Sequence, residues 1–201
     1  KYWGKSDARL NLPAVSSLSL AVPLFTQTQL ECSDKDQLKL DGIDYGADHD
    51  MARRLFTFAD TVLGAERPGL SVRTFNNVPA GTGLASSAAG FAAFVKALNN
   101  LYGWEMDARC LSILARIGSG SACRSLFPGF VKWHKGVRED GMDSCAAPLD
   151  TSWPELRIAM LAVTRDKKPV GSTEAMQHCA ATSPKYQDWL AANAQAMAEI
   201  G

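Results

Sequence analysis

The residues best suited to chemistry form a run of small side chains from Pro79 to Ala89 that leads into a predicted helix. Gly81 and Gly83 allow the backbone to adopt positive φ angles and to approach a ligand closely. The helix directs unpaired first-turn N–H groups toward the same place, where Ser86 and Ser87 add hydroxyls. This combination predicts a site for phosphate or another anion. A short Gly-x-Gly match also suits an ordinary turn with a serine cap, so the prediction depends on the rest of the chain.

A second segment suited to chemistry runs from Ser119 to Ser125. Ser119 and Ser121 supply two hydroxyls separated by one glycine, and Arg124 follows three residues after the second serine. A guanidinium can hold a carboxylate through two parallel hydrogen bonds while neighbouring hydroxyls donate from the side. The other interpretation is a helix C-terminus followed by the serine cap of the next helix, which leaves Arg124 in solvent.

Two basic segments could complete an anion site. Lys1 and Lys5 lie four residues apart around a Tyr-Trp-Gly turn, which makes a compact cationic patch, although a solvated surface turn has the same composition. The stretch from Arg165 to Glu174 is a basic loop that leads into a helix with Ser172 as its predicted cap. This stretch is another candidate for phosphate binding, with an ordinary solvated loop as the alternative.

Strands are predicted to build the first part of the chain, because apolar residues alternate there with a period of two. Asp41 and Gly42 lie between two alternating arms, which is the strongest short signal for a β-hairpin. The region before the first helix is therefore predicted to be antiparallel sheet. The predicted strands are 16–20, 25–31, the hairpin 38–45, 70–75, 130–135 and an apolar, covered strand over 156–163.

Apolar residues at helical spacing predict helices from 48 to 64, from the central loop to Gly103, from 107 to 118, and onward from 183. Asp107 is the predicted N-cap of the third helix, which is expected to bury Leu111 and Leu114. The last helix should begin at Ser183-Pro184 and turn Tyr186 and Trp189 inward. The second helix is expected to bury Ala88, Phe91, Val95, Leu98 and Tyr102.

Length, charge and cysteine usage restrict the class of protein. The 201 residues suffice for one large domain or about one and a half ordinary ones. Lysine plus arginine and aspartate plus glutamate both number 21, so the chain lacks the positive field that attracts duplex nucleic acid or an anionic membrane. We expect a soluble intracellular protein, because no apolar run is long enough to cross a bilayer and no signal-peptide pattern is present. The five scattered cysteines predict neither a zinc site nor a disulfide framework.

Five segments together resemble mevalonate diphosphate decarboxylases, members of the superfamily named for galactokinase, homoserine kinase, mevalonate kinase and phosphomevalonate kinase. The central loop marks only the superfamily, whereas the opening Lys-Tyr-Trp-Gly-Lys and the Ser-Gly-Ser-Ala-Cys-Arg run are more specific to the decarboxylase branch. The loop departs from the family at Gly81-Thr82, where two alanines are common, but its Pro-x-x-x-Gly-Leu-x-Ser-Ser frame is intact, so we expect the phosphate cradle to be retained. The segments are 1–5, 79–89, 119–125, 140–144 and 170–174.

The resemblance implies ATP-dependent decarboxylation of mevalonate 5-diphosphate to isopentenyl diphosphate, in the mevalonate route of isoprenoid biosynthesis. ATP phosphorylates the tertiary hydroxyl, and phosphate then leaves as the carboxylate is lost as CO₂. By resemblance, Arg124, Ser119 and Ser121 hold the carboxylate, Tyr2, Lys5 and Ser172 hold the diphosphate, and Lys1 lies near the reacting hydroxyl. The expected catalytic residues are Lys1, Ser87 and Arg124.

The cofactors implied are ATP and Mg²⁺, with Ser87 at the transferred phosphoryl group or the metal. A mobile lid that carries Lys167 and Lys168 is expected to close on ATP. The remaining contacts implied for the nucleotide phosphates are Gly81, Gly83, Leu84, Ala85, Ser86 and Ala88. The expected partner is the small-molecule substrate, in a cytoplasmic homodimer without nucleic-acid or membrane partners.

The implied fold is α+β in two lobes, the two-lobed fold of the small-molecule kinase superfamily. Residues 1–154 are expected to form a sheet-and-helix lobe with the ATP loop, and 155–201 to open a second lobe that is incomplete and exposes apolar surface. The family's essential aspartate belongs to an Asp-Ala-Gly-Pro-like loop that does not occur here, and Asp140 and Asp143 lie in a turn that the family uses structurally. The chain starts without methionine and stops within a helical pattern, so we expect the essential aspartate to lie beyond Gly201. A chain that ended at Gly201 should bind phosphate but show little turnover.

Two other functions fit part of this pattern. A neighbouring kinase that phosphorylates mevalonate or phosphomevalonate without loss of CO₂ would share the central loop but has less use for Ser119, Ser121 and Arg124 as a carboxylate clamp. A non-catalytic binding or assembly module on the same fold is the second alternative. The products formed from ATP and mevalonate 5-diphosphate distinguish a decarboxylase, which releases CO₂, from a kinase, which does not. Loss of turnover on replacement of Arg124 distinguishes an enzyme with a carboxylate clamp from a non-catalytic module.

Overall fold

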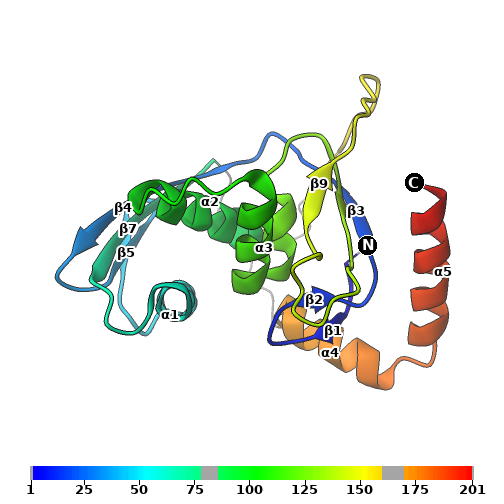
Figure 1. Cartoon of the computed structure of the whole chain (residues 1–201), viewed down its shortest axis with the longest axis horizontal. Coiled ribbons are helices and arrows are strands. Elements are labelled where there is room, and N and C mark those ends of the chain that lie inside the picture. Colours follow the sequence, from blue (N-terminus) through cyan, green and yellow to red (C-terminus); the bar gives the residue numbers. More distant parts are fainter. Residues whose placement is uncertain (1, 78–85, 160–169, 201) are drawn as a thin grey trace.

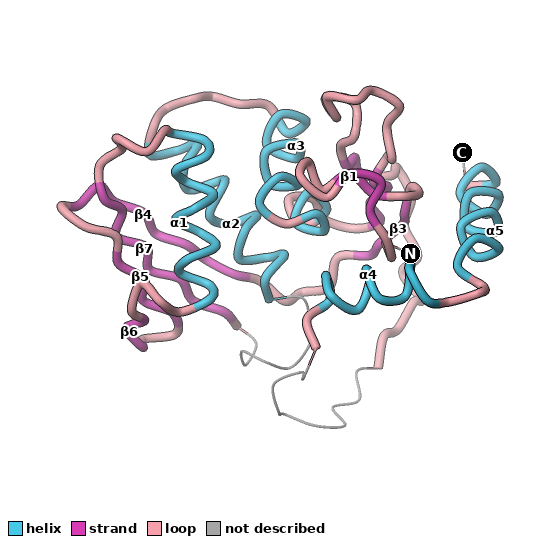
Figure 2. Tube along the Cα trace, turned by 90° about the horizontal axis from the view of Figure 1, so that it is seen from below, coloured by secondary structure: helices cyan, strands magenta, loops and turns pink. Residues whose placement is uncertain are grey.

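The computed structural model describes residues 2–77, 86–159 and 170–200, which form a mixed α+β structure. The larger sheet has the strand order β4-β7-β5-β6, and α1 and α2 pack against it at one end of the molecule (Figures 1 and 2). Apolar side chains of the sheet and of both helices form the larger core. The elements of this part are β4 (Thr26–Ser33), β5 (Gln37–Leu40), β6 (Ile43–Tyr45), α1 (Asp50–Leu63), β7 (Gly69–Asn76) and α2 (Ser86–Leu101).

The β5–β6 hairpin forms where the sequence predicts it. Asp41 and Gly42 have φ angles of 51° and 84°, both in the left-handed region that a type I′ turn requires. The strand pairs within the region before α1, β1 (Lys5–Asp7) with β2 (Leu12–Pro13) and β5 with β6, are antiparallel as predicted. The sheet as a whole is mixed, however: β7, which follows α1, pairs antiparallel to β4 and parallel to β5. The cause is the connection, because α1 lies between β6 and β7 and carries the chain across the sheet before β7 begins.

The third predicted helix, α3 (Ala108–Gly118), begins as expected, since the Asp107 carboxylate accepts the N–H of Cys110 at 2.7 Å. Its burial differs from the prediction. Leu111 and Leu114 are only half-buried against the larger core. The fully buried residues are Ser112, Ile113, Ala115 and Arg116, because α3 is also covered by the segments around β2, β9 and the 136–144 turn.

A smaller antiparallel sheet lies between the larger core and the C-terminal helices. It consists of β3 (Ser17–Leu20), β8 (Phe130–Trp133) and β9 (Ala146–Pro148), in the order β3-β8-β9. The short strands β1 (Lys5–Asp7) and β2 (Leu12–Pro13) pair beside it. A 3₁₀ turn, η1 (Gly120–Arg124), follows α3 directly, and its Cys123 packs with Val131, Trp133 and Ala146 in a second, smaller core.

Residues 156–159 do not form the predicted covered strand. They are irregular, and Ile158 is 52% exposed, beside Trp153, which is 60% exposed. Within the described ranges no strand runs beside this segment, so its backbone has no ladder to join. The predicted exposure of apolar surface here is confirmed, whereas residues 160–163 lie outside the described part of the chain.

Both C-terminal helices begin slightly differently from the prediction. Ser172 is the first residue of α4 (Ser172–Thr182) and not its cap, which is Gly171. Helix α5 (Tyr186–Glu199) starts after Lys185, because the N–H of Ser183 still belongs to the end of α4, where it donates to the Cys179 carbonyl. Tyr186 is buried as predicted, and Trp189 is half-buried and stacked on it.

Helix α4 lies beside β1 at the turn that starts the chain (Figures 1 and 2), and the first residue of α5, Tyr186, also contacts this turn. The N–H of Gly4 donates to the sulfur of Met176 at 3.4 Å, and the Tyr186 hydroxyl donates to the Trp3 carbonyl at 3.4 Å. Gly4 has a φ of 124°, and a Cβ at this position would lie 1.8 Å from the Tyr186 oxygen. Only glycine fits here, both for backbone conformation and for space.

Replacing Gly4 with alanine should lower the free energy of unfolding by about 3 kcal/mol, from backbone strain and the clash with Tyr186. Part of this loss should return in Gly4→Ala/Tyr186→Phe, which lacks the clashing oxygen. Gly129→Ala is the matched control, since Gly129 also has a positive φ but a Cβ there would meet nothing within 4 Å. Urea unfolding measures all three variants; equal losses at Gly4 and Gly129 would show that the contact with Tyr186 is not responsible.

Candidate functional site

The buried indole of Trp133, on β8, supports two of the predicted site residues. The ring of Tyr2 lies 4.7 Å from it between centroids, and the guanidinium carbon of Arg124 lies 5.7 Å from the same ring. The indole N–H donates to the Ser144 hydroxyl at 3.2 Å, which fixes the ring in its plane. A Cβ on Gly120 would lie 2.7 Å from the Tyr2 oxygen, so the glycine between the two predicted serines makes room for Tyr2.

The alternative interpretation is correct in part, since Ser119 is both the C-cap of α3 and the N-cap of η1, but Arg124 is half-buried and does not lie in solvent. One guanidinium nitrogen donates to the hydroxyl of Ser17 at 3.3 Å. Burial lowers the pKa of Arg124, although an arginine remains charged. Within the described ranges no carboxylate lies at ion-pair distance from it. A desolvated cation with no protein anion is suited to bind an anionic ligand.

The hydroxyl of Tyr2 is buried and finds no hydrogen-bond partner among the described residues. Burial raises the pKa of Tyr2 to about 12, with a further upward contribution from Cys123 and an opposing one from Arg124. The phenol is therefore neutral near neutral pH and retains a proton that it can donate. Buried polar groups in proteins are normally paired, so this donor is suited to an oxygen of a ligand.

Lys5 and Arg54 bring two more cations together. Burial lowers the pKa of Lys5, and the charge of Arg54 lowers it further. The guanidinium of Arg54, on α1, lies 5.2 Å from the ring centre of Phe91, on α2. Neither cation pairs with a carboxylate in the described part of the chain. Like charges gathered in this way favour an anion near them.

Arg54 is a candidate site residue that the sequence motifs did not indicate. A signal for it exists, because Arg54 lies three residues after Met51 and four before Phe58, within the apolar stripe of α1. A cation at this spacing is the signal that the sequence offers, although Arg54 itself is exposed, with its guanidinium beside the ring of Phe91. Trp133 could not be identified from the sequence, since an aromatic residue in a strand is indistinguishable from an ordinary core residue.

The C-terminal end of α3 is the point where the predicted segments meet. Lys5 is tied to it through Asn11, whose amide donates to the Ile117 carbonyl at 2.8 Å. Helix α2 packs closely against this end of α3, because the Phe91 ring of α2 lies over Gly118, where an added Cβ would be only 2.4 Å from the ring. Ser119 and Ser121, both half-buried, follow at once and lead to Arg124. The start of the chain, α2 and the serine–arginine segment therefore converge.

Ser87 and Ala88 lie in the first turn of α2, one helical turn before Phe91. Ser87 is half-buried, Ala88 is buried, and the first turn carries no acidic residue to offset the positive end of the helix. This helix end is therefore electrostatically suited to phosphate. The predicted contacts Lys1, Gly81, Gly83, Leu84, Ala85, Lys167 and Lys168, and the side chain of Ser86, lie outside the described residues.

Ser172 is exposed at the first position of α4, one turn before Met176. Met176 contacts Gly4, between Tyr2 and Lys5, so Ser172 belongs to the helix end that borders the N-terminal turn. The structure brings this helix to the turn but gives no contact of the Ser172 side chain.

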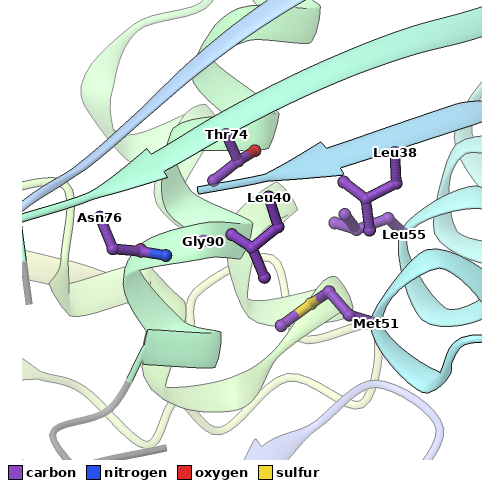
Figure 3. A pocket seen from close by; sticks show the side chains of 7 residues that line it. All are labelled: Leu38, Leu40, Met51, Leu55, Thr74, Asn76 and Gly90. Carbon is purple, nitrogen blue, oxygen red and sulfur yellow. The ribbon is translucent and has the colours of Figure 1, made fainter. Parts of the chain in front are cut away.

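A small cavity beneath the larger sheet is not part of this site. It is lined by Leu38 and Leu40 of β5, Thr74 and Asn76 of β7, Met51 and Leu55 of α1, and Gly90 of α2 (Figure 3). Its volume is about 40 Å³. An engineered cavity of about 150 Å³ is known to hold a single benzene. The cavity is therefore too small for a ligand of the size of benzene.

The two acidic residues of the 136–144 turn have structural partners. Asp143 accepts the N–H groups of Val137 and Arg138, and Asp140 pairs with the Arg138 guanidinium. These donors hold the pKa of both carboxyls below its usual range. The largest cause is the Arg138 side chain for Asp140 and the Val137 N–H for Asp143. Within the described ranges no three His, Cys, Asp or Glu side chains are grouped to hold a metal ion, and no helix is long and apolar enough to span a membrane.

The described residues form a mixed α+β structure in which cations without a described carboxylate partner, together with the Tyr2 hydroxyl, gather around the end of α3 and Trp133, an arrangement suited to an anionic ligand. Comparison with known proteins narrows this class. Residues 1–146 match the family described as the diphosphomevalonate decarboxylase-like N-terminal domain, and the chain belongs to this family.

Individual proteins of this family are similar to the chain in sequence and in structure. The diphosphomevalonate decarboxylase of Candida albicans is 43% identical over 210 residues, which cover 95% of this chain and 58% of that protein. The crystal structure of mevalonate diphosphate decarboxylase from Staphylococcus aureus superimposes with a TM-score of 0.84 at 30% identity, over 99% of this chain and 61% of that one. A complex of MDDEF with MVAPP, AMPPCP and magnesium gives 0.82 at 31% identity, over 100% of this chain and 62% of that one. The chain thus spans somewhat more than half the length of these relatives.

Proposed function

We propose that this chain supplies the substrate-binding and nucleotide-phosphate-binding residues of an ATP-dependent diphosphomevalonate decarboxylase. The reaction converts mevalonate 5-diphosphate and ATP to isopentenyl diphosphate, ADP, phosphate and CO₂. The observation that carries the proposal is the half-buried Arg124, which rests on Trp133 beside the orphan hydroxyl of Tyr2 and has no carboxylate partner among the described residues.

Arg124, with Ser119 and Ser121, would hold the substrate carboxylate. The planar guanidinium can form two parallel hydrogen bonds with it, which fixes the plane of the carboxylate relative to the carbon that carries the tertiary hydroxyl. Orientation matters because the bond to CO₂ breaks as phosphate departs from the neighbouring carbon, and its electron pair becomes the new double bond. The rigid support of Arg124 by Trp133 and Ser17 favours this role.

Tyr2, Lys5, Arg54 and Ser172 would hold the substrate diphosphate. Lys5 and Arg54 supply positive charge that has no protein counterion in the described part of the chain, and Tyr2 supplies a neutral donor. A diphosphate that leaves water requires such compensation. Arg54 is an addition to the residues that the motifs indicate.

ATP and Mg²⁺ are proposed to bind at the N-terminal end of α2, where first-turn N–H groups and the Ser87 hydroxyl are suited to phosphate oxygens and a hard cation. When bound, the metal neutralises charge on the transferred phosphoryl group. Of the remaining motif residues, we propose that Gly81, Gly83, Leu84, Ala85, Ser86 and Ala88 line the phosphates, that Lys1 lies near the reacting hydroxyl, and that Lys167 and Lys168 belong to a lid over ATP.

The proposed division into lobes places residues 1–154 in the first and 155–201 in the second. The family match covers residues 1–146, which lie within the proposed first lobe. A cytoplasmic homodimer is also proposed, on the family resemblance alone; sedimentation equilibrium of the purified protein tests it.

Product analysis tests the proposed reaction. Full-length protein incubated with ATP, Mg²⁺ and mevalonate 5-diphosphate should release CO₂, ADP, phosphate and isopentenyl diphosphate in equal amounts. Accumulation of a phosphorylated acid without CO₂ would instead support the small-molecule kinase. Absence of ADP formation, with substrate binding retained, would support the non-catalytic module.

A further inference from the structure

Asn11 connects the ammonium group of Lys5 to the end of α3. Its side-chain oxygen accepts from Lys5 Nζ at 2.6 Å, and its amide nitrogen donates to the Ile117 carbonyl at 2.8 Å. The carbonyl belongs to the last turn of α3, where backbone acceptors lack helical partners. One amide thus satisfies both a cation and a helix end.

The backbone around Asn11 is fixed independently of Lys5. Asn11 has a φ of 53°, in the left-handed region that asparagine tolerates better than most residues. The preceding carbonyl, of Leu10, accepts a hydrogen bond from the buried Arg116 side chain at 3.1 Å. Both anchors, Arg116 and Ile117, lie on α3, so the Asn11 amide has a defined position relative to this helix.

The position of Lys5 is therefore set by the same helix end that leads into the serine–arginine segment. An ammonium group has three N–H donors, and Asn11 occupies one of them, which leaves two for a ligand. Without Asn11 the four-carbon side chain of Lys5 would be free to move among many rotamers. Ordering it on ligand binding would then cost free energy.

We propose that Asn11 is a positioning residue that holds the Lys5 ammonium at a defined distance from Arg124. The diphosphate end and the carboxylate end of one substrate can then be bound at the same time. This inference rests on the proposed function, in which Lys5 contacts the substrate diphosphate. Asn11 itself does not contact the substrate.

A double-mutant cycle tests this role. The dissociation constant of mevalonate 5-diphosphate is measured by titration calorimetry on the full-length protein and on Asn11→Gly, Lys5→Ala and the combined variant. Glycine retains the left-handed backbone and removes the amide, and it should weaken binding about tenfold, the equivalent of one lost charge-assisted hydrogen bond. In the Lys5→Ala background the same change should have no further effect.

The matched control is Glu105→Gly, which removes the side chain of another residue with a left-handed backbone, at φ 52° and exposed. Its affinity should equal that of the unmodified protein. Equal losses from Asn11→Gly with and without Lys5 would overturn the positioning role and indicate that Asn11 only supports the turn. Unchanged affinity in Asn11→Gly would also overturn it. If Lys5→Ala itself retains full affinity, the proposed role of Lys5 fails, and the positioning of Lys5 fails with it.

A second variant covers the case in which Asn11→Gly does not fold. Asn11→Asp preserves the shape and the acceptor oxygen, and it places a carboxylate against Lys5. Burial and Arg54 lower the pKa of Lys5 in the unmodified protein, so the new carboxylate should raise it. NMR titration of the Lys5 side chain measures this pKa; an unchanged value would overturn the contact on which the proposal is built.

Discussion

Replacing Arg124 with alanine should reduce kcat/KM for mevalonate 5-diphosphate about a thousandfold, or about 4 kcal/mol of transition-state stabilisation. In the proposed complex the substrate carboxylate is the counterion of this half-buried guanidinium, which forms no ion pair with the residues that the structure describes. Removing the guanidinium leaves the carboxylate desolvated and unpaired, which costs more than the loss of an exposed contact. Steady-state kinetics with full-length protein measure the effect.

Two further variants show whether the guanidinium itself is responsible. Arg124→Lys retains the charge but lacks the planar fork and stacks less well on Trp133, so it should recover only part of the activity. Arg138→Ala removes an exposed arginine whose partner is Asp140, and its kcat/KM should stay within about twofold of the unmodified protein. Because Arg124 also contacts Ser17, thermal unfolding is recorded for each variant. A folded Arg124→Ala variant with unchanged kcat/KM would remove Arg124 from the mechanism.

Replacing Arg116 with methionine should lower the free energy of unfolding by about 3–5 kcal/mol. The Arg116 side chain is fully buried on α3 and donates to the carbonyls of Leu10, Gly141 and Ser144. Burial lowers its pKa, but the guanidinium remains charged and satisfied by these oxygens. Methionine fills similar volume and leaves the three buried acceptors without this donor.

Arg109→Met is the matched control, because Arg109 lies on the same helix and also donates to the 136–144 turn, at the Met142 carbonyl. Arg109 is exposed, so its replacement should change stability by less than about 0.5 kcal/mol. Urea unfolding at equal protein concentration measures both variants. Equal losses of stability in the two variants would show that burial does not make the hydrogen bonds of Arg116 more important than those of Arg109. A loss below about 1 kcal/mol in Arg116→Met would contradict the argument from unsatisfied acceptors.

The elements that the sequence predicts correctly are those with a local cause. Asp41 and Gly42 form the hairpin turn because their backbone preferences need no distant partner. Asp107 caps α3 through an N–H only three residues away. The parallel pairing of β5 with β7 and the irregular backbone of 156–159 could not be predicted in the same way, since each depends on which strand lies alongside.

The candidate site shows the same division. Residue types and motif resemblance indicate Tyr2, Lys5 and Arg124 as anion-binding residues, and the structure brings all three to the end of α3 or to Trp133. The supporting residues were not predictable from spacing. Arg54 enters through the packing of α1 on α2, and Trp133 through the pairing of β8 with β3.

By itself the sequence determined short-range features of this protein: the Asp41-Gly42 turn, the Asp107 cap, the approximate positions of the helices, and which chemical groups are available to bind an anion. The tertiary structure alone decided that these groups meet, and which of them remain unpaired within the described residues. The reason is physical. Backbone preferences act over a few residues, whereas the contacts of Asn11 with Ile117 and of Arg116 with Leu10 join positions more than a hundred residues apart and form only when the chain packs.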